Sequence, residues 1–411
     1  MRHDSTRPSL PSPLLPAILL LAACGAGERA ATDIAVRDSA GIAIVENTAA
    51  VWPEGGGWHL SPEPLVEIGV LDGAPEDQLF RVVGARRLGD GRIVVANSGT
   101  HELRFYDAQG RHLRSVGREG EGPGEFRGLG AIHRYTADSI VAYDFRLRRL
   151  SIFDADGGFG RSMALPVIGE RTTPQFVGAF DDGTILLRTG RIFSTRDELR
   201  TGVSRDSSVF YRVAADGAVL DTIGVFPGSE AFVYTIENGL TVMGLAFGRN
   251  AVADVQGLHF YFGAGETYEV AIHAADGALQ RLVRRRFDNL AVTPQDIERY
   301  KQRQLEATTD DNWRRMQERI FAEMPFPATM PAYSRVLADA AGNLWVAEYR
   351  RPGDDQPRWT VFDLDGRMLG TVDMPQGFSP TEIGSDYVLG TIRDELDVER
   401  VRLYELVRPA G

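Results

Sequence analysis

The chain has 411 residues, of which 43% are hydrophobic and 25% are charged, so its composition is that of a folded protein rather than a disordered or collagen-like chain. The 45 basic and 57 acidic residues give a formal net charge of −12, which argues against a partner held by its phosphate backbone, such as nucleic acid. The single cysteine excludes a disulfide framework.

The amino terminus has the pattern of an export signal. Arg2 and Arg7 precede an apolar run from Leu14 to Leu21, which is too short to span a bilayer and ends in small residues before Cys24. The segment Leu21-Ala22-Ala23-Cys24-Gly25 resembles the bacterial lipoprotein signal, in which a peptidase cuts before the cysteine and the sulfur then carries a lipid. An ordinary secretory signal with a chance cysteine is the alternative interpretation.

The resemblance implies that residues 1–23 are a signal peptide and that Cys24 is the lipid attachment site. Residues 24–40 are then a lipidated, flexible tether, because Gly25 to Asp38 is small and polar. We expect the mature protein to be held at a membrane of the bacterial cell envelope by this lipid anchor. By the same resemblance, Gly25 after the cysteine favours the outer membrane.

A repeat runs through residues 41–411. An apolar strand ends in an Asp/Gln-Gly turn and a second strand follows, as at Phe105 to Gly110, Ile152 to Gly157, Arg212 to Gly217, Ile272 to Gly277 and Val361 to Gly366. A second set of turns precedes these strands, at residues 90–91, 138–139, 182–183, 256–257, 342–343 and 385–386. Each unit therefore has four strands, here called a to d, with short a–b and c–d turns.

The counts of the two turns predict how the units assemble. Six a–b turns but only five c–d turns occur, and the last unit ends after strand c, between Arg400 and Val407. The segment from Trp58 to Gly69 has the pattern of a d strand without a hairpin of its own. If it pairs with the last c strand, it closes a ring of six four-stranded blades and removes the open edges. The sequence thus predicts an all-β fold, a six-bladed β-propeller; a seven-bladed ring or a sandwich of hairpins remains open.

Residues 117–126, Gly-Arg-Glu-Gly-Glu-Gly-Pro-Gly-Glu-Phe, closely resemble the loop of NHL-type repeats. The whole chain resembles a six-bladed propeller lipoprotein of the TolB-like propeller superfamily. The similarity is strong over residues 80–160, whereas the second blade lacks the glycine-rich loop and the third and fourth are degenerate. It therefore implies the fold rather than a ligand.

The connections that differ in length from unit to unit are the b–c and d–a loops, which lie on one face of a propeller. Binding residues are often carried by such loops on a rigid scaffold. The largest element is a helical insertion at about 293–324 between blades four and five, where Thr293-Pro294 starts one helix and Thr309 or Asp310 starts a second. It is interpreted either as a buttress or as a lid. The passage from Gly224 to Gly248 is expected to be a long loop of the same face.

On this loop-rich face the sequence places Arg146 and Arg148 in the second blade, Tyr349, Arg350 and Arg351 in the fifth, and Arg393 in the sixth. Converging guanidinium groups can hold a carboxylate or sulfate through paired hydrogen bonds, so these are the ligand-binding candidates. The alternative is that each arginine pairs with an acidic residue nearby in the sequence, such as Asp144, Glu348 or Asp394.

No catalytic or metal-binding motif is evident, since the seven histidines lack metal-ligand spacing and no nucleophile elbow or phosphate-binding loop occurs. We therefore expect no catalytic residue, metal or cofactor. The predicted function is non-catalytic binding of a protein, peptide or glycan at the bacterial envelope. The alternative is a calcium-dependent lactonase- or esterase-like hydrolase, suggested by resemblance to six-bladed enzymes, with Arg81, Gln175, Asn250 and Glu382 nearest the channel.

Overall fold

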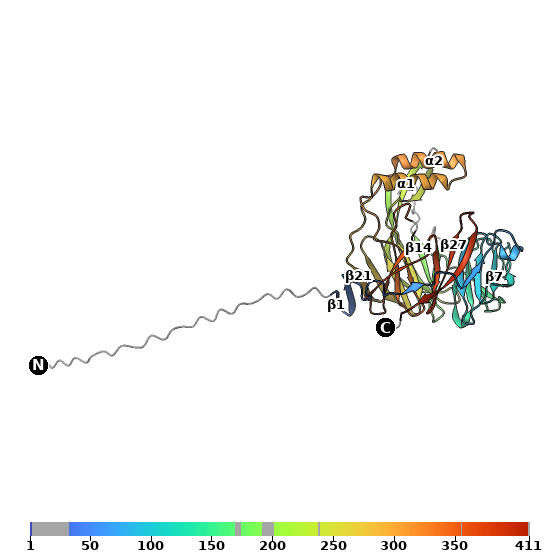
Figure 1. Ribbon diagram of the computed structural model, residues 1–411, viewed down its shortest axis with the longest axis horizontal. Helices are drawn as coiled ribbons and strands as arrows, with labels where there is room; N and C mark the ends of the chain where they lie inside the picture. The colour runs from blue at the N-terminus through green and yellow to red at the C-terminus, as the bar shows by residue number, and fades with distance from the viewer. Residues whose placement is uncertain (2–32, 169–173, 191–200, 237–238, 355, 410–411) are drawn as a thin grey trace. The chain divides into compact units, whose positions relative to one another are not determined.

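The structure is a computed structural model that describes Met1 and residues 33–168, 174–190, 201–236, 239–354, 356–409. Residues 33–411 cluster as one compact unit. Its strands form six sheets arranged as blades around a common axis (Figure 1), and the strand pairs within them are antiparallel except for one at the edge of blade four. Cys24 and the predicted signal peptide lie outside the described residues.

The first two blades each consist of four strands in chain order. Blade one contains β5 (Val82–Arg87), β6 (Ile93–Asn97), β7 (Glu102–Tyr106) and β8 (His112–Val116). Blade two contains β9 (Leu129–Arg134), β10 (Ile140–Asp144), β11 (Arg149–Phe153) and β12 (Phe159–Ala164), with a 3-10 turn, η2 (Thr136–Asp138), between its first two strands.

Blades three and four carry extra strands. Blade three contains β13 (Gln175–Ala179), β14 (Ile185–Gly190), β15 (Gly202–Val213), β16 (Val219–Ile236) and β17 (Gly239–Gly244). Blade four contains β18 (Val252–Gln256), β19 (His259–Gly263), β20 (Glu269–Ala274) and β21 (Leu279–Arg285), and its outer edge is extended by β2 (Ile42–Asn47) and β1 (Ile34–Ser39).

Blade five contains β22 (Tyr333–Ala338), β23 (Leu344–Glu348), β24 (Arg358–Phe362) and β25 (Met368–Asp373). Blade six contains β26 (Ser379–Ile383), β27 (Tyr387–Arg393) and β28 (Glu399–Val407). Its fourth position is taken by β4 (Val66–Ile68) and β3 (His59–Leu60), which both pair antiparallel with β28. The predicted closure of the ring by an N-terminal strand is confirmed.

The ring is continuous at its centre. The innermost strands contact one another in the order β5, β9, β13, β18, β22, β26 and again β5. The apolar core is divided into clusters between neighbouring blades. On β6, Ile93 and Val95 belong to the cluster shared with blade six, whereas Val94 and Ala96 belong to the cluster shared with blade two. Because both faces of the second strand are buried, its residues are apolar without alternation.

The glycine of the repeated c–d turn is needed for two reasons. Gly110 and Gly366 both have φ of +82°, a conformation that side chains disfavour. In addition, a Cβ at Gly110 would lie 2.8 Å from Val66 Cγ1, and one at Gly366 would lie 2.9 Å from Val283 Cγ2. Each turn therefore packs closely against the outer strands of the preceding blade, so the motif also sets the spacing between blades.

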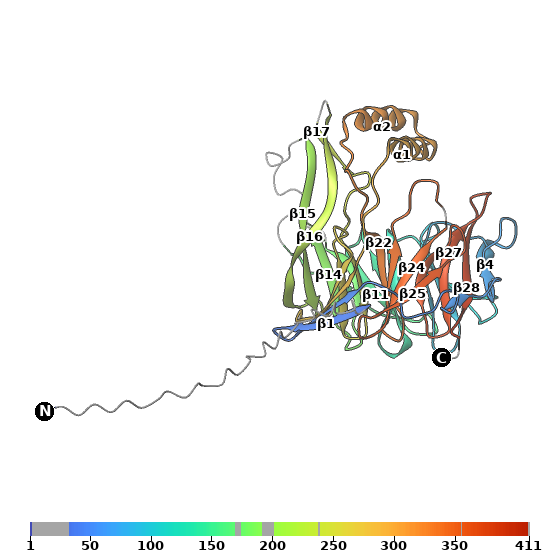
Figure 2. The same ribbon diagram turned by 60° about the vertical axis from the view of Figure 1, so that its left-hand side comes forward.

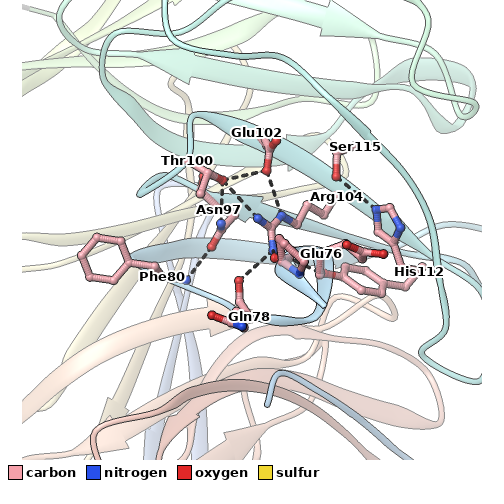
Figure 3. Close-up of polar contacts among 11 residues, drawn as sticks. Glu76, Gln78, Phe80, Asn97, Thr100, Glu102, Arg104, His112 and Ser115 are labelled. Carbon is pink, nitrogen blue, oxygen red and sulfur yellow. Dashed lines mark hydrogen bonds and ion pairs between the residues drawn. The ribbon is translucent and has the colours of Figure 1, made fainter. Parts of the chain in front are cut away.

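The link from the closing strand to blade one is held by a buried arginine (Figure 3). Arg104 of β7 donates from Nη1 to the carbonyl oxygens of Pro75, Glu76 and Gln78 at 3.0, 3.1 and 2.7 Å. These residues form or follow the 3-10 turn η1 (Pro75–Asp77). Since η1 connects β4 to β5, Arg104 fixes the segment that joins the last blade to the first.

The helical insertion is confirmed as α1 (Pro294–Glu306) and α2 (Asp311–Glu323). The cap of α1 is reciprocal: the Thr293 side chain accepts from the Asp296 N–H, and the Asp296 carboxylate accepts from the Thr293 N–H at 2.9 Å. Asp310, rather than Thr309, caps α2 by accepting from the Trp313 N–H at 2.7 Å. Both helices begin where their side-chain caps satisfy free backbone N–H groups.

Two expectations about the loops are wrong. The predicted tether includes Ile34–Ser39, but this segment is strand β1, which pairs with β2, and β2 runs parallel to β21. Residues 24–32 of the tether lie outside the described part. The expected loop from Gly224 to Gly248 instead continues β16 to Ile236 and returns as β17, because β15 and β16 form a long hairpin that extends beyond the blade (Figure 2).

The helices pack on this extended hairpin. Ile320 and Phe321 of α2 are buried in one cluster with Phe232 of β16 and with Phe247, and Tyr300 of α1 packs against the same cluster. Tyr300 and Phe247 have their ring centroids 5.5 Å apart. The apolar stripe of the insertion is thus covered within the chain, which favours the buttress interpretation over the lid.

Candidate functional site

The central channel contains a cavity of about 860 Å³. Its wall is built mainly from the innermost strands of the blades, and several a–b turns, at residues 136–138, 181, 256–257 and 340, form one end. The polar side chains at its wall include Arg86, His133, Arg188, Asp254, Arg335 and Glu382. The cavity therefore reaches the face with the short turns, opposite the loop-rich face that the sequence analysis favoured.

Arg86 on β5 and Arg335 on β22 are held by backbone carbonyls rather than by carboxylates. Arg86 donates from Nη1 to the carbonyl oxygens of Ala85 and Thr381, both at 2.8 Å. Arg335 donates from Nη1 to the carbonyl oxygen of Pro380 at 2.8 Å. These bonds use one terminal nitrogen of each guanidinium. They hold both side chains in orientation, and the N–H groups on the other nitrogens remain available as donors.

Asp254 on β18 is an acidic group of the same wall on which the charges of both arginines act. Its Oδ2 accepts from the Ala338 N–H at 2.8 Å. Burial raises the pKa of this carboxyl to about 6, against the opposing effect of hydrogen bonds from the Ala338 and Val255 N–H groups and of the charges on Arg335 and Arg86. Desolvation outweighs attraction because neither guanidinium lies within 4.0 Å of it as an ion pair among the described residues.

His133 on β9 is neutral in this environment. Burial, reinforced by the positive charge of Arg86, lowers the pKa of its imidazole to about 4. Its Nδ1 lies 3.0 Å from the carbonyl oxygen of Arg134. Because a carbonyl only accepts, Nδ1 carries the proton and Nε2 is left as an acceptor. This side chain can therefore accept a hydrogen bond from a hydroxyl group at neutral pH.

Arg188 on β14 lies toward the opposite end of the wall. It donates from Nη2 to Gln175 Oε1 at 2.7 Å and from Nη1 to the carbonyl oxygen of Ala251 at 3.4 Å. Burial lowers the pKa of Arg188 and also of Arg335 from the ordinary value, although a guanidinium still remains charged. Both partners of Arg188 among the described residues are neutral, so within that part of the chain its charge is met by dipoles.

The carboxylate of Glu382 on β26 accepts hydrogen bonds from neighbouring groups of the protein. Its Oε2 accepts from the Arg87 N–H at 3.0 Å, and its Oε1 accepts from the Tyr387 hydroxyl at 2.5 Å. Of the four residues that the sequence analysis placed nearest the channel, only Glu382 lines the cavity. Arg81, Gln175 and Asn250 are exposed and lie outside its wall, because they stand at or before the beginnings of the inner strands, whereas the cavity is lined farther along these strands.

The loop-face candidates occupy several separate settings. Arg146 is exposed, with its guanidinium carbon 6.0 Å from the centroid of the Phe145 ring. Arg148 is partly buried and has a φ of +51°. Arg393 pairs with Asp397 at 2.9 Å and with Glu399 at 2.5 Å. Arg393 is thus paired within its own blade.

The fifth-blade candidates are tied to the helical insertion. Arg351 forms an ion pair with Asp296, the residue that caps α1. Tyr349 packs against the cluster that holds the helices, and burial raises the pKa of its hydroxyl to about 12. Arg350 is exposed and donates to the carbonyl oxygen of Asp354 at 3.5 Å. Arg351 and Tyr349 therefore have a structural role at this face.

Arg86, Arg188, Asp254 and Arg335 were not among the residues predicted from the sequence, and His133 was one of the seven histidines set aside for lack of metal-ligand spacing. A signal was present for two of them, since Arg86 and His133 both stand two residues before the position whose N–H closes the a–b turn, Leu88 and Tyr135. When the units are aligned on this turn, Arg86 and His133 stand at equivalent positions of the innermost strands. This pattern indicates that they line the channel. The sequence does not show which side chains from other blades lie near them, because the closed ring brings those blades together.

The channel does not fit a calcium ion. Calcium takes six to eight oxygen ligands, with carboxylates prominent among them. Here Asp254 stands near Arg86 and Arg335, and both oxygens of Glu382 accept hydrogen bonds from the protein. Within the described ranges, no three His, Cys, Asp or Glu side chains gather as a metal site. The donor set is instead suited to an anionic or hydroxylated ligand.

Comparisons with known proteins bear on the fold. A family model described as a six-bladed beta-propeller, DUF5128, matches residues 74–174. A solved structure of a DUF4221 family member from Bacteroides vulgatus is 12% identical, with a TM-score of 0.52 over 86% of this chain and 99% of that one. No curated protein matches the chain significantly. These similarities support a six-bladed propeller and leave the ligand open.

Two further solved structures are more distant in shape. A protein from Bacteroides fragilis described as exported is 13% identical, with a TM-score of 0.47 over 89% of this chain and 99% of that one. A gluconolactonase from Xanthomonas campestris is 14% identical, with a TM-score of 0.40 over 87% of this chain and all of that one. In the part of the chain that the structure describes, no helix is long and apolar enough to cross a membrane.

Proposed function

We propose that this protein is a lipid-anchored, non-catalytic binding protein of the bacterial cell envelope that takes its ligand in the central channel. The cavity of about 860 Å³ carries the proposal, since it has the size of a small-molecule site and a wall of oriented polar groups. Neither serine nor cysteine is among the described residues of its wall. The hydroxyl of Thr381 donates to the Ala85 carbonyl oxygen at 3.0 Å, so it is not prepared as a nucleophile.

The location at the envelope rests on the segment Leu21-Ala22-Ala23-Cys24. In this proposal the NHL-like propeller is exported, cut before Cys24, acylated there and kept at the outer membrane. Strand β1 begins at Ile34, which leaves a short connection between the acylated cysteine and the propeller.

The anchor is tested by Cys24→Ala in the native host. The variant should lose palmitate incorporation and leave the membrane fraction. Unchanged labelling and an unchanged membrane fraction would show that the protein is not a lipoprotein of this kind.

The channel is tested by capture of ligand from an envelope extract, read by native mass spectrometry. Thr136→Trp places a large side chain at the exposed rim of the cavity and should remove the captured mass. Arg350→Ala, on the loop-rich face, should retain it. If Arg350→Ala loses the ligand and Thr136→Trp keeps it, the loop face is the binding surface. Steady turnover of esters or lactones by the purified protein would instead favour a hydrolase.

A further inference from the structure

Three arginines of the channel have no acidic partner among the residues that the structure describes. Arg86, Arg188 and Arg335 donate to carbonyl, amide or hydroxyl oxygens, and within the described residues none of them is joined to a carboxylate within 4.0 Å. Elsewhere the fold readily pairs its arginines, as where Arg358 makes two bonds to Asp373 at 2.6 and 3.0 Å. Other arginines also lack a described carboxylate partner, such as Arg149 and Arg281, which donate to backbone carbonyls, but the three of the channel share the wall of one cavity.

The acidic residues of the same wall do not offset this charge directly. Asp138 accepts from the Gly89 N–H and pairs with Arg134 at 3.1 Å, and Asp181 is exposed in an a–b turn. Glu382 is held by Arg87 and Tyr387, as described above. Among the described residues of the wall, Asp254 is the carboxyl on which Arg335 and Arg86 act, so one carboxyl lies near two guanidiniums. Burying a charge without a partner is costly, so a fold that keeps three such groups in one cavity is suited to an anion that enters it.

The remaining groups indicate what else the anion carries. A guanidinium presents paired N–H donors that match the two oxygens of a carboxylate. The free Nε2 of His133 accepts a hydrogen bond, and a Cβ built on Gly178 would lie 3.5 Å from it, so this nitrogen faces the neighbouring inner strand near the channel. A ligand with hydroxyl groups can donate to this nitrogen and to Asp254.

Resting on the proposed function, we propose that the channel binds a small organic acid that carries both a carboxylate and hydroxyl groups. Arg86 and Arg335 bind the carboxylate, Arg188 supports a second acidic or hydroxyl group, and His133 accepts from a hydroxyl. The cavity of about 860 Å³ exceeds what a single inorganic ion needs, which is why an organic acid is the fitting class.

Isothermal titration calorimetry of the mature protein with three probes separates the contributions. Glucuronate has a carboxylate and hydroxyl groups, glucose has hydroxyl groups without the carboxylate, and succinate has carboxylates without hydroxyl groups. We expect glucuronate to bind most tightly, succinate more weakly and glucose not measurably at millimolar concentration. Glucose binding as tightly as glucuronate would overturn the role of the arginines while leaving a channel-binding function intact.

Arg335→Gln and Arg86→Gln test the same point from the protein side. Glutamine still donates a hydrogen bond to the neighbouring carbonyl, so the strand contacts are kept while the charge is lost. Each variant should weaken glucuronate binding about tenfold to a hundredfold, the usual effect of a hydrogen bond to a charged group. Arg111→Gln, an exposed arginine paired with Asp107 in a c–d turn, is the matched control and should change nothing.

Arg335→Lys is a second variant that keeps the positive charge but lacks the paired N–H donors of a guanidinium. It should bind glucuronate with an affinity between those of the parent protein and Arg335→Gln. Circular dichroism and melting curves confirm that the variants are folded. The proposal is wrong if folded Arg335→Gln and Arg86→Gln bind glucuronate as well as the parent protein does, or if neither acid binds at millimolar concentration. These outcomes are independent of the Cys24→Ala fractionation, which judges the anchor.

Discussion

The substitution Asp254→Asn should stabilise the protein at neutral pH, which is unusual for a residue at a functional site. Burial raises the pKa of Asp254 from 3.8 to about 6, so the folded state holds this proton more tightly than the unfolded state does. The stability linked to that proton is fully present below the unfolded pKa and is lost as the pH rises through about 6. At neutral pH the ionised carboxylate is therefore a net cost.

The magnitude follows from the shift. About two pKa units correspond to at most about 3 kcal/mol, since one unit is worth about 1.4 kcal/mol. The charged groups around Asp254 are Arg335 on β22 and Arg86 on β5, and their attraction is already contained in the shift, as is the hydrogen bond from Ala338. The buried hydroxyl of Tyr261, on the adjacent strand β19, is neutral in this range because its pKa is raised by burial.

The assay is the free energy of unfolding from chemical denaturation at about pH 8 and about pH 4, for the parent protein and Asp254→Asn. Asparagine can still accept from the Ala338 N–H. The variant should be more stable by up to about 3 kcal/mol at the higher pH, and the difference should shrink toward zero at the lower pH. A difference that is independent of pH, or a variant that is less stable at the higher pH, would refute the reasoning.

The remaining predictions concern other parts of the fold. Burial lowers the pKa of His133 to about 4, so the pH dependence of stability that it causes runs opposite to that of Asp254: the free energy of unfolding falls as the pH falls from about 6.5 through 4. His133→Gln should reduce that loss of stability in the same denaturation series. Asn47→Ala should cost about 2–4 kcal/mol, measured by chemical denaturation, since it leaves the Arg284 and Gly366 carbonyls and the Met368 N–H without their buried partner; a cost under about 0.5 kcal/mol would contradict this. Arg351→Ala should speed proteolysis at α1 without lowering channel binding, because its ion pair to the Asp296 cap is lost; unchanged cleavage would show that the pair does not hold the helix.

Much of the architecture is predictable because it is encoded locally. The turn at Asp363 to Gly366 can be recognised from four letters, since the Asp363 side chain accepts from the Asp365 and Arg367 N–H groups and Gly366 takes a positive φ. The helix caps at Thr293 and Asp310 are equally local. The unequal number of the two turns even implied that a strand from before the first blade must complete the last one.

Local signals failed where the outcome depended on distant partners. Ile34–Ser39 was grouped with the small and polar residues before it as a tether, yet it becomes a strand because β2 is available beside it, and β2 in turn pairs with β21. The length of β16 is likewise set by its partners β15 and β17 and by the helices that cover it. Strand formation there follows from tertiary pairing rather than from composition.

By itself, then, the amino-acid sequence determined the repeating four-stranded unit, its turns, the closure of the ring and the two inserted helices, because each depends on residues adjacent in the chain or on counting units. The channel site was decided only by tertiary structure. Arg86 and Arg335 lie 249 positions apart and come together with Asp254 because the ring brings the first, fourth and fifth blades around one axis. Charge, burial and solvation at such a point depend on which neighbours the closed ring supplies, and no local pattern carries that information.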